Sequence, residues 1–212
     1  MRYSVAAILV ALSFSTYAQE REPIVGLPCE GCEAVFEGRP TNLSDRSRIG
    51  RIGEPGEPMT LVGRVTNASG KPAAGVIIYA YQTNADGIYP TDDSVRGMAS
   101  HRHGKLRAWA KTNSNGNYAF DTIRPAGYPG TDLPQHIHMH VIEPGCSTYY
   151  IDDAMFRDDP RLTTVQIKRL TLDRGSSGLS RPNRVKGVWF TRRDIVLGKN
   201  IPGYRNCTRP AI

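Results

Sequence analysis

The chain has 212 residues, of which 39% are apolar and 22% are charged, and its formal net charge is +7. This length is sufficient for one domain of ordinary size with a real hydrophobic core. No window contains 18 consecutive apolar residues, so we expect no membrane span in the mature chain. The 21 glycines and 15 prolines favour strands and turns over a helical bundle.

The first eighteen residues are typical of an export signal. Arg2 gives a short positive region, residues 5–14 form an apolar run with two serines, and residues 16–18 (Thr-Tyr-Ala) are a small-x-small cleavage site. We therefore expect a signal peptide at residues 1–18 and a mature protein that is exported, either periplasmic or secreted. A buried N-terminal helix is the alternative interpretation of this segment.

Four cysteines in an exported chain favour two disulfides. Cys29 and Cys32 form a C-x-x-C motif, whereas Cys146 and Cys207 are far apart in the sequence. No βαβ pattern surrounds the motif, as a thioredoxin-like site requires, and the other two cysteines do not complete a zinc site. We expect pairing of Cys29 with Cys32 and of Cys146 with Cys207, although four cysteines allow three connectivities.

Basic residues are concentrated near the C-terminus, where residues 181–212 contain eight Lys or Arg and Asp194 as the single acidic residue. These charges do not alternate with aromatic residues that could stack on bases, so we expect no nucleic-acid binding. The pattern indicates a solvated basic face, which could still attract anionic substrates.

Short runs rich in β-branched residues and separated by turn signals predict an all-β fold. A polar, turn-rich arm that contains the C-x-x-C motif occupies residues 19–58, and a β-sandwich or related barrel follows over residues 59–212. We expect strands over residues 59–67, 75–83, 106–112, 117–123, 135–143, 187–190 and 194–197. One helix is expected from Asp159-Pro160 to about Leu170, and residues 92–105 are expected to form a long loop.

Three of the five histidines lie in the segment His136-Ile137-His138-Met139-His140. On a strand, residues i and i+2 share a face about 6.6 Å apart, so two imidazoles can converge on one metal ion. His140 would lie about 13 Å from His136 and is expected outside the same coordination sphere. Zinc, copper and iron all accept imidazole, so this pattern alone does not select the metal.

Two tyrosines in loops near strand ends complete a recognisable series. Residues 84–89 (Asn-Ala-Asp-Gly-Ile-Tyr), 122–129 (Thr-Ile-Arg-Pro-Ala-Gly-Tyr-Pro) and 136–138 (His-Ile-His) together resemble the intradiol ring-cleavage dioxygenases. This family binds non-haem ferric iron, and the resemblance is to a small secreted branch with a protocatechuate 3,4-dioxygenase-like core. It implies an antiparallel β-sandwich of intradiol dioxygenase or transthyretin-like topology, with one short helix and long loops.

The resemblance implies Tyr89 and His136 as equatorial iron ligands, and Tyr128 and His138 as axial ones. Phenolate oxygens suit the hard Fe(III) ion, which must hold both phenols ionised against an ordinary pKa of about 10. The implied partners are a small aromatic diol and dioxygen, and the implied product is a muconate-type diacid that carries both oxygen atoms. The sequence does not decide whether the protein forms a homo-oligomer.

One position departs from the family pattern. Family members usually carry an arginine three residues before the first ligand histidine, where this chain has Leu133. Such a cation stabilises charge that develops on the substrate, a contribution of about 2.7–4 kcal/mol where single donors have been removed. Arg102 and Arg107 are possible substrate contacts that could supply a cation instead.

Two alternatives remain at this stage. Residues 63–65, 70–75 and 112–120 also resemble the transthyretin-like regulatory repeat, which would make the chain a non-enzymatic β-sandwich binding module. An exported copper or zinc enzyme could use His136 and His138 alone. Neither alternative gives Tyr89 or Tyr128 a role, so metal content separates the three hypotheses.

Overall fold

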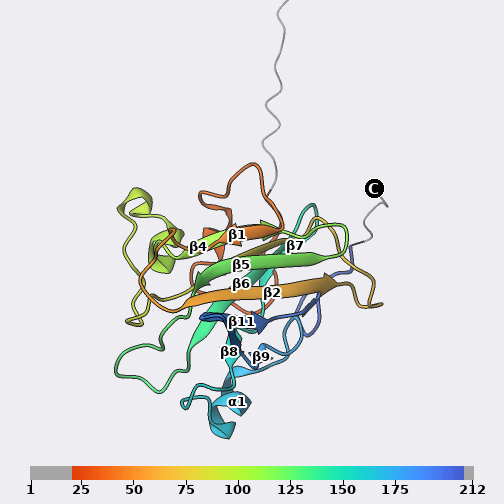
Figure 1. Ribbon diagram of the computed structural model, residues 1–212. Helices are drawn as coiled ribbons and strands as arrows, with labels where there is room; N and C mark the ends of the chain where they lie inside the picture. Colours follow the sequence, from red (N-terminus) through yellow and green to blue (C-terminus); the bar gives the residue numbers. More distant parts are fainter. Residues whose placement is uncertain (1–20, 208–212) are drawn as a thin grey trace, which may run out of the picture.

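Two β-sheets form the body of the chain in the computed structural model, which describes residues 21–207 (Figure 1). The predicted signal peptide at residues 1–18 lies outside the described residues. The first sheet has the order β1-β5-β2-β11-β10, with β12 also paired to β2, and the second has the order β4-β3-β6-β8-β9, with β7 also paired to β6.

The bounds of the elements are as follows. The first sheet contains β1 (Arg46–Arg48), β2 (Pro58–Thr66), β5 (Asn117–Ile123), β10 (Asn183–Val185), β11 (Val188–Arg192) and β12 (Ile195–Val196). The second contains β3 (Ile77–Tyr81), β4 (Arg107–Lys111), β6 (His136–Glu143), β7 (Ser147–Tyr150), β8 (Ala154–Phe156) and β9 (Leu179–Ser180). The helical elements are the 3-10 turns η1 (Cys32–Phe36), η2 (Asp93–Val95) and η3 (Ala99–His103), and the α-helix α1 (Thr164–Leu170).

The predicted all-β sandwich with one short helix is confirmed, and each predicted strand is present. The central pairs β2–β5, β3–β4 and β3–β6 are antiparallel, whereas β1, β11, β12 and β9 add parallel pairs. The sequence did not predict β1, β7, β8, β9 or β10. These strands contain four residues or fewer, too short for a hydrophobic period to be visible.

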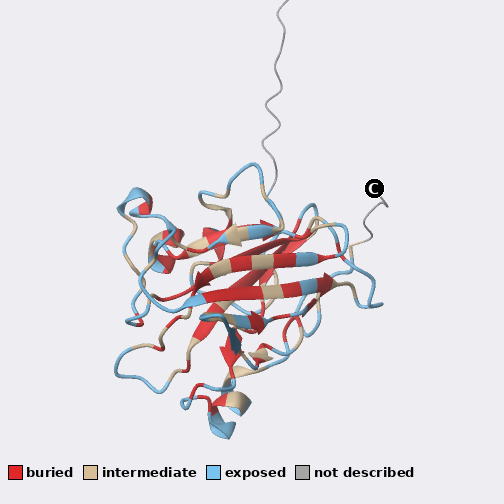
Figure 2. Cartoon of the chain, in the orientation of Figure 1, coloured by how far each residue is buried: buried red, intermediate tan, exposed pale blue. Residues whose placement is uncertain are grey.

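The second sheet is buried on both faces (Figure 2). On the inner face, Ile137, Met139 and Val141 of β6 join the core that both sheets share. On the outer face, Tyr79 and Ile142 join a smaller apolar cluster that η1 covers. Burial on both faces explains why β3 is a continuous run of aliphatic and aromatic residues without polar alternation.

The predicted start of the helix was wrong, although its end at Leu170 was right. The helix begins at Thr164, and the hydroxyl of Thr163 accepts the N-cap hydrogen bond from Gln166 N. Asp159 is not the cap because its carboxylate accepts backbone hydrogen bonds from Gln135 (2.5 Å) and Arg161 (3.0 Å). Asp159 therefore stabilises a turn that fixes the start of β6.

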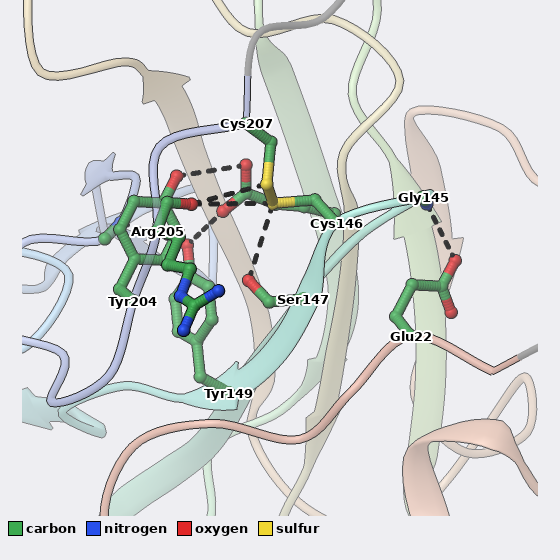
Figure 3. Close-up of a disulfide and its surroundings, with 10 residues drawn as sticks. Glu22, Gly145, Cys146, Ser147, Tyr149, Tyr204, Arg205 and Cys207 are labelled. Carbon is green, nitrogen blue, oxygen red and sulfur yellow. Dashed lines mark hydrogen bonds between the residues drawn. A yellow bond between two sulfur atoms is a disulfide. The ribbon is translucent and has the colours of Figure 1, made fainter.

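Both predicted disulfides are confirmed. The Cys29–Cys32 bridge closes the C-x-x-C turn, and the Cys146–Cys207 bridge ties the C-terminal segment to the turn between β6 and β7 (Figure 3). Beside the second bridge, the hydroxyl of Tyr149 donates to Glu143 Oε1 at 2.7 Å. Within the described residues, no helix is long and apolar enough to cross a membrane.

Phe120 tests the shared core. This residue is fully buried between the two sheets, whereas Phe190 is 37% exposed. We expect Phe120→Ala to lower the free energy of unfolding by about 3–5 kcal/mol, because it removes buried apolar surface and leaves a cavity. Phe190→Ala is the matched control and should cost less than about 1 kcal/mol in urea unfolding. Equal losses in the two variants would contradict the assigned core.

Candidate metal centre

Four predicted site residues converge on the outer face of the second sheet. His136 and His138 share one face of β6, as their i, i+2 spacing predicts. Tyr89 follows a turn after β3, in which the side chain of Asn84 accepts hydrogen bonds from the backbone of Asp86 and Ile88. Tyr128 comes from the β5–β6 loop, and Ala126 N donates to Asn84 O at 3.1 Å, which joins the two tyrosine-bearing loops.

The ligand atoms lie close together, and we call Tyr89 Oη, Tyr128 Oη, His136 Nε2 and His138 Nε2 the four-atom cluster. The two phenol oxygens are 2.6 Å apart, and the two imidazole nitrogens are 3.0 Å apart. His138 Nε2 lies 2.9 Å from Tyr89 Oη and 3.2 Å from Tyr128 Oη. His136 Nε2 lies 3.3 Å from Tyr128 Oη.

The outer hydrogen bonds of the two histidines assign their tautomers. His136 Nδ1 lies 2.7 Å from Pro134 O, and His138 Nδ1 lies 3.0 Å from Asp153 Oδ1. Both partners are acceptors, so each Nδ1 carries a proton and each Nε2 faces the cluster. Two lone pairs that face each other at 3.0 Å are favourable only when a cation or a donated proton lies between them.

This arrangement fits a single metal ion. Ligand atoms about 2.0–2.1 Å from one ion and roughly at right angles lie about 3 Å from each other, as the atoms of the four-atom cluster do. Two phenol oxygens among the ligands favour a hard, highly charged ion over Cu(I) or Zn(II). The residues present therefore fit Fe(III) by the chemistry of their ligand set.

Sequence reasoning missed the role of Asp153. Its carboxylate belongs, with the two imidazoles, to a group whose atoms lie within 4.8 Å of one another. It contacts His138 Nδ1, on the far side of the ring from the cluster, and so orients the imidazole rather than joining the four-atom cluster. Burial raises the pKa of Asp153, but the charge and hydrogen bond of His138 outweigh this and lower it to about 2.

Burial governs the protonation of the two phenols. It raises the pKa of Tyr89 and of Tyr128 above the ordinary value, and for Tyr89 the hydrogen bond and charge of Tyr128 raise it further. Burial also lowers the pKa of His136, and the neighbouring His138 adds to this effect. The neutral imidazole of His136 is ready to bind a metal, whereas the phenols need a strongly charged ion to lose their protons at neutral pH.

A stack of rings continues from the cluster into the protein. Tyr81 of β3 lies against His138, with ring centroids 4.5 Å apart, and against His103 on its other side at 3.7 Å. His103 is buried, and its Nδ1 lies 2.8 Å from Tyr79 Oη. The arm, which the sequence did not place relative to this loop, covers it.

A cavity of about 420 Å³ opens beside the cluster. It is lined by side chains from β3, β6, the loops that carry the tyrosines, the segment around η3, and the C-x-x-C turn. The lining residues are Pro28, Cys29, Glu30, Tyr81, Tyr89, Arg102, His103, Tyr128, His138, Met139, His140, Tyr150 and Asp153.

The two arginines singled out from the sequence lie in different places. Arg102 lines the cavity and forms an ion pair with Glu30. Arg107 is absent from the lining: its guanidinium is 9% exposed, donates to Glu37 O at 2.9 Å, and lies 3.7 Å from Asp92. Leu133, at the position of the family arginine, is half-buried and does not line the cavity either.

The buried histidines predict how stability depends on pH. Burial lowers the pKa of His103 and of His140 to about 3, so below pH 6.5 the unfolded chain binds more protons than the folded one. Stability therefore falls as the pH decreases, by about 2 kcal/mol for each histidine between pH 7 and pH 5. In urea unfolding of the metal-free protein, His103→Gln should remove its share of this loss. An unchanged pH dependence in the variant would contradict the assignment.

We expect the carboxylate of Asp153 to strengthen metal binding by the cluster. Asp153→Asn keeps the shape of the side chain but removes the charge that orients and polarises His138, so we expect about 10–100-fold weaker metal binding. The measurement is competition with a chelator of known affinity. Asp93→Asn is the control, because it removes the same charge from a side chain that is 74% exposed and away from the cluster. Equal affinity in the two variants would exclude the orienting role.

Comparison with known proteins identifies relatives of this chain. A family model described as "Dioxygenase" matches residues 36–174. The chain is 31% identical to 6-chlorohydroxyquinol 1,2-dioxygenase of Cupriavidus pinatubonensis over 112 residues, which cover 45% of this chain and 39% of that protein. It is 30% identical to the protocatechuate 3,4-dioxygenase beta chain of Burkholderia cepacia over 118 residues, 52% of this chain and 49% of that one. The chain therefore spans less than half the length of these relatives.

Solved structures share the fold. The dioxygenase domain of a dioxygenase carbohydrate-binding protein fusion from Streptomyces sp. SirexAA-E superposes with a TM-score of 0.58 at 21% identity. The superposition covers 83% of this chain and 98% of that one. Catechol 1,2-dioxygenase from Pseudomonas arvilla C-1 also gives a TM-score of 0.58, at 20% identity, over 91% of this chain and 66% of that structure.

Proposed function

Because the chain belongs to the intradiol ring-cleavage dioxygenase family, we propose that it binds Fe(III) and opens the ring of a catechol-type aromatic between its two hydroxyl-bearing carbons. Both atoms of dioxygen enter the product, a muconate-type diacid. The observation that carries this proposal is the four-atom cluster, in which two phenols and two imidazoles lie within 2.6–3.3 Å of their neighbours. Aromatic compound catabolism is the corresponding biological role.

Tyr89, Tyr128, His136 and His138 are the proposed ligands. When bound, Fe(III) supplies the positive charge that keeps the phenolates and the catechol oxygens ionised and draws electron density from the ring. Two phenolates and two neutral imidazoles bring two negative charges, which leaves one positive charge to attract a catecholate. Tyr128, an axial ligand in the family resemblance, would take up a proton from the incoming catechol at Oη.

The cavity suits a small aromatic diol. Its volume of about 420 Å³ falls within the usual range for small-molecule sites of roughly 300–1,000 Å³. Tyr150 contributes aromatic surface to the lining, while the cluster lies where the two hydroxyls would enter. Arg102 is the one Lys or Arg among the described residues that line the cavity, so it would supply part of the charge that the family arginine supplies elsewhere.

The alternatives receive less support from the geometry. A non-enzymatic transthyretin-like module or a copper or zinc enzyme would give no role to the two phenols, whose oxygens lie 2.6 Å apart. We propose that the protein acts after export, in the periplasm or outside the cell, because its two disulfides require an oxidising compartment.

Tyr89→Phe tests the ligand set. Loss of one phenolate removes an anionic ligand, so we expect iron content to fall at least tenfold and the visible tyrosinate-to-iron absorption band to weaken and shift. Tyr150→Phe is the matched control: it removes a hydroxyl from the same cavity but not from the four-atom cluster, and should keep both signals. Full iron content and an unchanged band in Tyr89→Phe would exclude this ligand set.

Turnover is tested separately with the iron-loaded protein. Oxygen uptake with catechol, together with mass spectrometry after reaction in ¹⁸O₂, should show one dioxygen consumed and two labelled oxygens in a ring-opened diacid for each catechol. A coloured iron protein that binds catechol but consumes no oxygen would exclude the enzymatic proposal while retaining the metal site.

A further inference from the structure

One wall of the substrate cavity comes from the N-terminal arm. Pro28, Cys29 and Glu30 all line the cavity, and they precede the residues that the dioxygenase family model matches, which begin at 36. The metal centre itself lies wholly within the matched part. The wall therefore lies outside the part of the chain that the family model matches, and it contains none of the four ligand residues.

The arm is firmly docked on the outer face of the second sheet. Val35 is fully buried, and its carbonyl accepts a hydrogen bond from Trp109 Nε1 at 2.7 Å. The carboxylate of Glu37 accepts backbone hydrogen bonds from Ser100 (2.7 Å) and Ala99 (3.3 Å) at the start of η3. The segment that follows Glu30 is therefore bound both to β4, through Trp109, and to η3, the element that contains Arg102.

The C-x-x-C turn then fixes where Glu30 lies. The Cys29–Cys32 disulfide closes a turn of four residues around it. Gly31 has a φ of 74°, and a Cβ atom there would lie 3.0 Å from His103 Nε2, so only glycine lets the turn approach the cavity floor this closely. Glu30 is therefore held at the mouth of the cavity by covalent and steric restraints.

Glu30 meets Arg102 across this mouth in an ion pair. Both side chains remain largely exposed, at 76% and 67%, so the pair adds little to stability. Among the lining residues, all of which lie in the described part of the chain, Arg102 is the single Lys or Arg, and the carboxylates are Glu30 and Asp153. Asp153 is engaged with His138, which leaves Glu30 to offset the charge of Arg102.

We propose that Glu30 sets the charge selectivity of the cavity: by pairing with Arg102 it offsets the attraction that this guanidinium would exert on catechols that carry a carboxylate on the ring. This inference rests on the proposed function, since it assumes that catechols bind at the cluster. A ring carboxylate that points to the mouth is attracted by Arg102 and repelled by Glu30, so the two effects largely cancel. An uncharged ring substituent meets neither effect.

Glu30→Gln frees the guanidinium of Arg102 while keeping the size of the side chain. The experiment loads each variant with iron and titrates it without oxygen, with catechol and with 3,4-dihydroxybenzoate, following the visible absorption band. We expect Glu30→Gln to increase the affinity for 3,4-dihydroxybenzoate relative to catechol by about fivefold at low salt, the upper range for exposed charge pairs. The gain should shrink as salt is added.

Glu33→Gln is the matched control. Glu33 is an exposed acid on the same arm, three residues further along, and it does not line the cavity. This variant makes the same change in net charge and should leave the ratio of the two affinities within about twofold of the unchanged chain. The double variant Glu30→Gln with Arg102→Gln should lose the gain of the single one, because the attracting cation is gone.

The outcomes separate the inference from the proposed function. If iron and catechol bind but Glu30→Gln and Glu33→Gln give the same affinity ratio, the selectivity role of Glu30 is excluded and the proposed function stands. If the gain persists in the double variant, Arg102 is not the group that Glu30 offsets, and the inference is likewise overturned. If the unchanged iron-loaded protein binds neither catechol, the proposed function fails and this inference fails with it.

Discussion

The antiparallel pairing of β3 with β6 is the constraint on which the rest of the structure depends. Its register places Tyr81 opposite His138 and Tyr79 opposite His140, so the histidine-bearing face of β6 lies beside the aromatic face of β3. The first sheet covers one side of this pair and the arm covers the other. A slip of one residue would turn the histidines into the shared core and the apolar residues outward.

The same pairing brings the tyrosines to the histidines. The chain leaves β3 through the turn that carries Tyr89 and enters β6 through the loop that carries Tyr128, so both tyrosines lie at the same end of the sheet as His136 and His138. Rigid strands supply the imidazoles, while hydrogen-bonded loops supply the phenols. Such a division fits a site in which two ligands stay fixed and another must give way to the substrate.

Much of the fold could be predicted from the sequence because the long strands carry their own signals. The alternation of histidine with Ile137 and Met139 correctly gave the two faces of β6, and turn residues bounded most other strands. The helix start was misplaced because Asp159 has the chemistry of a cap but is used in a turn. The short edge strands escaped prediction because tertiary contacts, not local pattern, define them.

The site was harder to derive. Spacing along a strand predicted that His136 and His138 could share a metal, but the tyrosines were found through resemblance, since no local rule joins residues about forty positions apart. Asp153 and the burial of His103 were missed because both depend on packing between segments distant in sequence. Arg102 and Arg107 looked equivalent in the sequence, and only the path of the chain separates them.

The docked arm also affects the order in which the parts of the chain fold. Residues 29–37 are made early, yet the face on which they rest consists of β3, β4 and β6 and exists only after residue 142 has been synthesised and paired. The cavity is therefore completed at a late step of folding, over long loop closures. A local opening that released only residues 29–37 would uncover the cavity beside the metal centre while both sheets stayed intact.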